Sequence, residues 1–231
     1  MGDSILFSIW GFQVSFVLFL EVISSILSFF CILFAVKEKI WTFPLGMIST
    51  AMYFFVFFMQ NVYSSMTLQI MFFAFNVYGL YKWTHPGKKD VAKADNTLAV
   101  TVMKSQGRIL IIAVIAILTV TLGYVMANLN NWLPALFPEE AKYVYLDTAI
   151  LSASLVAQYL MAIKKLESWA LWFAVDVVSA PFYFITVGWA TGILYFVFIF
   201  TAVMGWREWK KSVSVNNKKL TTDKPDLCKS V

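Results

Sequence analysis

Seven long apolar segments, each about 20 residues, limit what this chain can fold into. They lie roughly at residues 16–36, 41–60, 63–83, 109–129, 146–164, 169–187 and 189–208. A helix needs about 20 mostly apolar residues to cross the hydrocarbon core of a bilayer. Composition agrees, because 60% of the 231 residues are hydrophobic and 13% are charged, whereas a soluble domain carries roughly 45–50% and 25%. We therefore predict an all-α, polytopic membrane protein with seven transmembrane helices.

Polar stretches surround these segments. We expect an N-terminal interfacial segment over residues 1–15, with a short helix near 5–12, a cytoplasmic loop over 84–108 and a disordered cytoplasmic tail over 210–231. The tail is rich in Lys, Asn and Ser, and such a composition does not support a packed core.

The basic residues indicate how the chain is oriented in the bilayer. Following the chain through seven crossings places every Lys and Arg except Lys142 on one side. Positively charged loops stay in the cytoplasm. We therefore predict a multi-pass membrane protein with the N-terminus outside and the C-terminus in the cytoplasm. The charges form no interleaved basic patch of the kind that binds nucleic acid.

The chain also aligns with itself at an offset of about 126 residues. The matches include Glu21 with Asp147, Lys39 with Lys165, Gly79 with Gly205, and Trp83 with Trp209. We interpret residues 16–83 and 146–209 as two three-helix repeats, joined by a linker helix at 109–129. Because the linker carries the chain back across the bilayer, both repeats run in the same direction. Parallel repeats of this kind occur in transporters whose site lies between the repeats, near the midplane.

One carboxylate stands in the middle of an apolar segment. A charged side chain at the bilayer centre costs about 2.5–3.5 kcal/mol on the insertion scale, so Asp176 is the main candidate for function. It shares one helical face with Trp169, Trp172 and Tyr183, at spacings of three or four residues. A face of this kind suits a flat cation, because aromatic rings contribute cation–π contacts of about 0.5–2 kcal/mol. The alternative is that Asp176 bonds to a neighbouring helix.

Other polar residues of the apolar segments are weaker candidates. The possible ligand contacts are Gln69, Asn76, Thr191 and Tyr195. The same residue types also serve as hydrogen-bonding contacts between membrane helices. Glu21 and Asp147 begin their repeats near the outer boundary and have either a structural or a gating role; Gln158 is a further residue of this class.

The chain offers no catalytic constellation, so we predict that it is not an enzyme. Its single histidine, His85, lies in a loop, and the sequence has neither a paired-histidine metal motif nor a phosphate-binding glycine loop. We accordingly predict no catalytic residue, metal or cofactor. A small-solute channel is the alternative from a different class of protein.

The second repeat carries the run Glu167-Ser168-Trp169-x-x-Trp172-x-x-x-Asp176, and later Gly205-Trp206-x-x-Trp209. With Tyr78-Gly79-x-x-x-Trp83 in the first repeat, the chain resembles the Pnu family of bacterial vitamin transporters over about residues 20–210. The resemblance implies a 3+1+3 helix arrangement similar to the SWEET facilitators, a homotrimer, and a location in the bacterial inner (plasma) membrane. It also implies facilitated diffusion of an unphosphorylated vitamin, which a separate cytoplasmic kinase then traps by phosphorylation.

Two positions bear on the branch of that family. Nicotinamide riboside members carry Asn where this chain has Asp176, and Asn where it has Ser49, so Ser49 joins the candidate substrate contacts. We therefore predict a uniporter for a cationic B vitamin, with thiamine as the first choice and nicotinamide riboside as the alternative. Both are cationic, so charge does not separate them, and riboflavin or another vitamin remains open.

Overall fold

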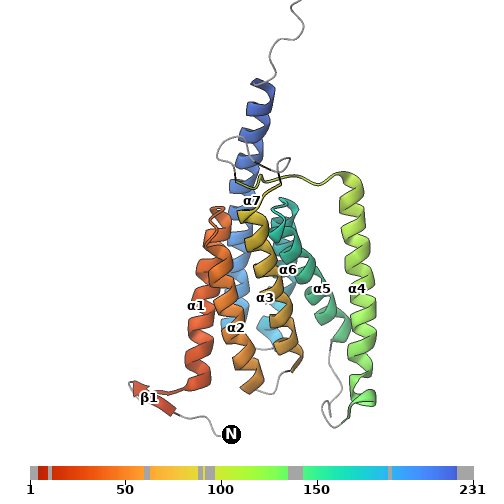
Figure 1. Cartoon of the computed structure of the whole chain (residues 1–231). Helices are drawn as coiled ribbons and strands as arrows, with labels where there is room; N and C mark the ends of the chain where they lie inside the picture. Colours follow the sequence, from red (N-terminus) through yellow and green to blue (C-terminus); the bar gives the residue numbers. More distant parts are fainter. Residues whose placement is uncertain are drawn as a thin grey trace, which may run out of the picture. The chain divides into compact units, whose positions relative to one another are not determined.

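The computed structural model describes residues 5–9, 12–59, 63–87, 91, 97–134, 143–186 and 189–222. This part of the chain forms one β-hairpin and seven helices (Figure 1). The elements are β1 Ile5–Ile9, β2 Phe12–Ser15, α1 Phe16–Val36, α2 Thr42–Met59, α3 Tyr63–Thr84, α4 Ser105–Trp132, α5 Val144–Ala162, α6 Glu167–Thr186 and α7 Trp189–Thr222. All seven predicted segments are thus helical.

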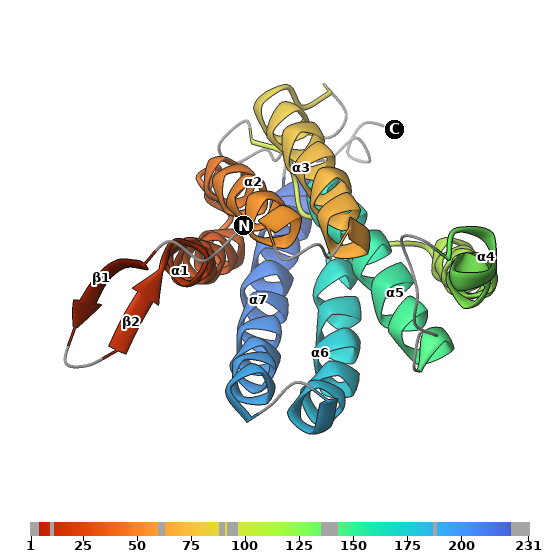
Figure 2. The same ribbon diagram turned by 90° about the horizontal axis from the view of Figure 1, so that it is seen from below.

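The helices fall into two compact units. The first contains Met1–Ala99 and Ser214–Val231, and the second contains Val100–Val213. In the first unit α1 packs on α2 and α2 packs on α3, as Figure 2 shows. In the second unit α4 packs on α5 and α5 packs on α6.

Four helices of the described part, α1, α2, α4 and α5, are long and apolar enough to cross a membrane. Their exteriors are apolar as well: on α4, Ile109, Ile112 and Val120 are all more than half exposed. Such large exposed aliphatic side chains suit a lipid environment, since a water-soluble helix presents its polar face outwards.

Two predictions at the ends of the chain are wrong. Residues 5–9 and 12–15 pair as antiparallel strands, with Phe7 opposite Val14 and Ile9 opposite Phe12, rather than forming an interfacial helix. β-branched and aromatic residues favour strands, and a segment this short forms an isolated helix poorly.

The predicted disordered tail is also helical as far as Thr222, because α7 continues past Trp209. No Gly or Pro interrupts residues 207–222. An ion pair from Lys211 to Glu208, 2.8 Å long and three residues apart, supports the helix. Residues 223–231 lie outside the described part.

The turns after α1 and after α5 have the same geometry. Glu38 and Lys164, which the repeat alignment pairs, both adopt the left-handed conformation, with φ of 55° and 57°. In both turns a hydrogen bond of 2.9 Å spans five residues, from Lys39 N to Phe34 O and from Lys165 N to Leu160 O. These bonds, with the left-handed residue, define the Schellman ending of a helix. The two helix ends therefore close alike at the predicted offset.

The two units also share an aromatic contact, between α2 and α3 in the first unit and between α6 and α7 in the second. In the first unit the rings of Phe43 and Trp83 meet edge-to-face, with centroids 4.9 Å apart. In the second unit Trp169 and Trp209 do the same, at 5.6 Å. A Cβ on Gly79 would overlap the Phe43 ring, and one on Gly205 would overlap the Trp169 ring. Each glycine is thus required for the close approach of an aromatic ring, at positions that the repeat alignment pairs.

Candidate functional site

Asp176 lies midway along α6, where its side chain is 4% exposed. Within the described part of the chain its carboxylate has neither a hydrogen bond nor an ion pair. A buried ionised carboxylate is strongly unfavourable unless a cation or hydrogen-bond donors compensate it. The predicted alternative, in which Asp176 bonds a neighbouring helix, therefore finds no support among the described residues.

Two buried hydroxyls, one on α6 and one on α5, also lack hydrogen-bond partners within the described residues. Ser179, one turn after Asp176, and Ser152 on α5 are both 0% exposed. Neither Oγ atom has a hydrogen-bond partner within the described residues. Buried polar atoms are nearly always hydrogen-bonded, so Asp176, Ser179 and Ser152 are positions on α5 and α6 where a ligand or water would complete the bonding. Two further buried atoms of α6, Glu167 Oε2 and Trp169 Nε1, also have no partner within the described residues. Sequence reasoning missed Ser152, since nothing in its spacing separates it from the other small residues of α5.

Of the aromatic candidates, Trp172 lies close to Asp176 along α6, whereas Trp169 packs against another helix. Trp172 is partly buried and stands one turn before Asp176. Trp169 is 2% exposed, and its ring packs on Trp209 and Gly205. Tyr195 on α7 is partly buried and meets Phe198 edge-to-face. The side chains of Tyr183 and Thr191 lie outside the described residues.

In the first unit, two predicted ligand contacts are engaged in helix packing. The Ser49 hydroxyl donates to the Ser24 carbonyl at 2.9 Å and is 2.6 Å from the Ser28 hydroxyl. Asn76 is 4% exposed and donates from Nδ2 to the Phe72 carbonyl at 2.9 Å. Its side chain also fills the space above Gly46 on α2. Ser49 thus bonds to a neighbouring helix, whereas Asn76 bonds within α3 and packs its side chain against α2.

The remaining candidates are four polar side chains of α1, α3 and α5. Gln69 on α3 and Gln158 on α5 are partly buried. Glu21 and Asp147 are exposed, near the starts of α1 and α5. Within the described residues, no group of three or more His, Cys, Asp or Glu side chains could hold a metal ion.

The segment before α4 is hydrogen-bonded to the turn between α5 and α6. Thr101 N donates to the Lys164 carbonyl at 3.2 Å, and Leu166 N donates to the Thr101 carbonyl at 3.0 Å. Lys165 Nζ donates to Thr101 Oγ1 at 2.8 Å. The turn is therefore covered: Leu166 is 4% exposed, while its repeat partner Ile40 is 37% exposed.

Glu167 completes this attachment at the first residue of α6. Its Oε1 atom accepts from Met103 N at 2.9 Å and from Arg108 Nε at 3.1 Å. Arg108 lies in the first turn of α4, so the ion pair joins the starts of two helices. Because α6 carries Trp172 and Asp176, this attachment positions the helix that holds the main candidate site.

Comparison with known proteins decides the family. A sequence profile described as "Nicotinamide mononucleotide transporter" matches residues 18–211. The chain belongs to this family. It is therefore a membrane transporter, and the predicted resemblance to the Pnu proteins is confirmed.

Curated relatives cover most of the chain. The nicotinamide riboside transporter PnuC of Escherichia coli K12 is 30% identical over 215 residues, which span 87% of this chain and 88% of that protein. PnuC of Neisseria mucosa is 23% identical over 201 residues, spanning 83% and 72% of the two chains. The riboflavin/roseoflavin transporter RibM of Streptomyces davaonensis is 23% identical over 189 residues, spanning 82% and 83%. A crystal structure of the vitamin B3 transporter PnuC matches with a TM-score of 0.64, at 22% identity, over 86% of this chain and 83% of that chain, and supports the fold.

Proposed function

We propose that this protein carries nicotinamide riboside into the cell by facilitated diffusion. The observation that carries the proposal is the similarity to a nicotinamide riboside transporter, at 30% identity over 87% of the chain. The sequence alone put thiamine first, whereas the names of two of the three relatives above favour the alternative.

The chemistry of the α6 face supports a cationic substrate. Nicotinamide riboside carries a permanent positive charge on its pyridinium ring and an amide group that donates hydrogen bonds. The buried, unpartnered carboxylate of Asp176 would balance the charge, and the Trp172 ring one turn away would contact the flat ring. The hydroxyls of Ser152 and Ser179 would bond to its polar groups. Riboflavin fits this face less well, because its neutral ring system would leave the carboxylate without a counter-charge.

Thiamine is a second candidate because of one residue. By the family resemblance, Asp176 stands at the position for which the nicotinamide riboside branch is expected to carry Asn. A carboxylate there would pair with the thiazolium charge of thiamine or accept from its aminopyrimidine, whereas an amide would not supply the charge. The two vitamins must therefore be compared directly.

We further propose that transport is uncoupled. The sequence has no phosphate-binding glycine loop that could use ATP. Asp176, the buried acid midway along α6, would already be occupied by a cationic substrate. Substrate would equilibrate across the membrane, and a separate cytoplasmic kinase would make uptake one-directional. The predicted 3+1+3 arrangement, homotrimer and cytoplasmic C-terminus complete the proposal, and the matching turns after α1 and α5 support the repeat.

Purified protein in sealed liposomes tests this function. Labelled nicotinamide riboside should enter only until its internal and external concentrations are equal, and excess unlabelled substrate should slow its entry. Enclosing a riboside kinase with ATP should raise the internal label further. Accumulation above equilibrium under an imposed proton or sodium gradient, with no kinase, would overturn uncoupled transport. Entry that never saturates would indicate a channel instead.

A further inference from the structure

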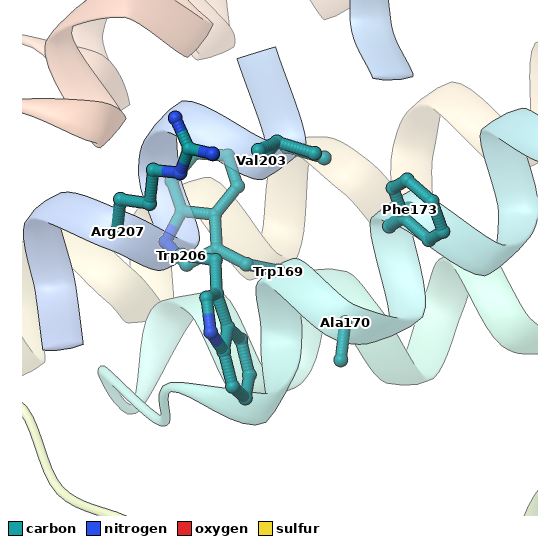
Figure 3. A pocket seen from close by; sticks show the side chains of 7 residues that line it. Trp169, Ala170, Phe173, Val203, Trp206 and Arg207 are labelled. Atoms are coloured by element: carbon teal, nitrogen blue, oxygen red, sulfur yellow. The ribbon is translucent and has the colours of Figure 1, made fainter. Parts of the chain in front are cut away.

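A groove separates α6 from α7 in the second unit, away from Asp176. It has a volume of about 300 Å³. Its walls come from the start of α6 and from the middle of α7: Trp169, Ala170, Phe173, Val203, Trp206 and Arg207 (Figure 3). Asp176 is not among the lining residues, so this groove is distinct from the candidate substrate face.

The groove is apolar along its length and cationic at one end. Arg207 and Phe173 lie at opposite ends of it, as Figure 3 shows. Arg207 is exposed and forms no ion pair within the described residues. The neighbouring Glu208 pairs with Lys211, at 2.8 Å. Lys210 follows one turn later on the same face of α7 and is also exposed. Arg207 therefore lines one end of the groove, and Lys210 lies one turn further along α7; the described part of the protein neutralises neither cation.

The order of residues along α7 places that end at a membrane boundary. The helix is apolar up to Gly205, then reads Trp206-Arg207-Glu208-Trp209-Lys210-Lys211. Trp and basic residues are enriched where the hydrocarbon core meets the headgroups. This end of α7 also carries the charges that predict the cytoplasmic side. The apolar part of the groove thus lies at acyl-chain depth, and Arg207 lies at phosphate depth.

We propose that the groove binds an anionic phospholipid of the inner leaflet. One acyl chain lies between α6 and α7 against Phe173 and Val203, and the phosphate is held by Arg207 and Lys210. Basic pockets between membrane helices on the cytoplasmic side recognise anionic headgroups, and each nearby Lys or Arg strengthens the attraction. The lipid also has a structural effect, because Trp169 forms both a wall of the groove and the contact with Trp209 that holds α6 to α7.

The rival occupant is a second copy of this chain. A stable interface buries about 800 Å² on each partner, whereas this groove is narrow and is lined by a few residues from two helices. The arginine at its mouth would also need an acidic partner on the second copy. The charge of the groove therefore favours a phospholipid.

Native mass spectrometry of the purified, full-length protein tests the proposal. The probes are phosphatidylglycerol and phosphatidylcholine with identical acyl chains. The wild type should retain one phosphatidylglycerol per chain, with an affinity roughly 10- to 30-fold above that for phosphatidylcholine. Replacing both cations, Arg207→Gln with Lys210→Gln, should abolish the preference. The matched control is Lys211→Gln, which removes a cation from the same turn that Glu208 already pairs, and it should keep the preference.

A second variant tests the apolar part of the groove independently of the two cations. Val203→Trp fills the apolar part and should lower retention of both lipids, while the mass of the assembled oligomer stays the same. Equal affinity for the two lipids in the wild type would overturn the proposal. So would a preference that Lys211→Gln removes as fully as the double variant, because that would be a general effect of net charge. A change in oligomeric mass with Val203→Trp would assign the groove to a subunit contact instead.

Discussion

The two glycines beneath the aromatic rings provide a sharp test of the packing. In an exposed helix interior, Gly→Ala stabilises by about 1 kcal/mol. At Gly79 and Gly205 the added methyl would instead overlap the ring of Phe43 or Trp169. Neither ring can withdraw easily, because each is also packed edge-to-face on a tryptophan. Overpacking costs about 1–3 kcal/mol, so we expect each alanine variant to lose roughly 1–2 kcal/mol of unfolding free energy.

Gly107 in the first turn of α4 is the matched control. There the nearest atom to an added Cβ is the terminal methyl of Met103, at 2.9 Å, which can rotate away. Gly107→Ala should therefore leave the melting temperature unchanged or raise it slightly. Thermal unfolding of the four proteins in one detergent gives the comparison. A second variant, Trp169→Leu, should relieve Gly205→Ala, with a coupling free energy above about 0.5 kcal/mol. The packing described here is refuted if Gly79→Ala and Gly205→Ala raise the melting temperature as Gly107→Ala does.

Three further outcomes are expected. Glu167→Gln keeps the shape of the side chain but removes the ion pair to Arg108. Since Arg108 is half exposed, we expect a loss of about 1 kcal/mol of stability. In liposomes, the maximal transport rate should fall while the substrate affinity stays unchanged. Asp176→Asn removes the charge and keeps hydrogen bonding, so the ratio of nicotinamide riboside affinity to thiamine affinity, measured by calorimetry, should rise; a fall would contradict the branch argument. A reporter fused after Trp209 should be cytoplasmic and one inserted near Pro138 external; the opposite result would reverse the predicted orientation.

The helices could be predicted because each apolar segment is long and the chemistry of the bilayer permits little else. The first segment predicts α1 at the bounds that the structure gives, Phe16–Val36. The ends of the chain were harder, because they are not made of long apolar runs. Residues 5–15 form strands by local pairing, and residues 210–222 stay helical because nothing interrupts α7.

The candidate site was predictable where a single residue is anomalous. Asp176 is conspicuous as an acid within an apolar segment, and the structure leaves it buried and unpartnered within the described residues. Ser49 and Asn76 were less predictable, because a polar side chain in a membrane helix can serve a ligand or a neighbouring helix equally well. The bond from Ser49 to Ser24 joins α2 to α1, and the contact of Asn76 with Gly46 joins α3 to α2, so both appear only once the helices are packed. The attachment of Thr101 and Glu167 joins distant parts of the sequence, which no local pattern encodes.

The substrate, and with it the central claim, is tested most directly by calorimetric titration of the purified protein with nicotinamide riboside. The comparison is between the wild type, Asp176→Ala and Asp147→Ala, the last removing an exposed acid at the start of α5. Loss of a charge-assisted contact costs about 1.5–3 kcal/mol, so Asp176→Ala should weaken binding by roughly 10- to 100-fold, while Asp147→Ala should bind as the wild type does. Wild-type protein that binds thiamine or riboflavin but not nicotinamide riboside, or an Asp176→Ala variant with undiminished affinity, would contradict the account.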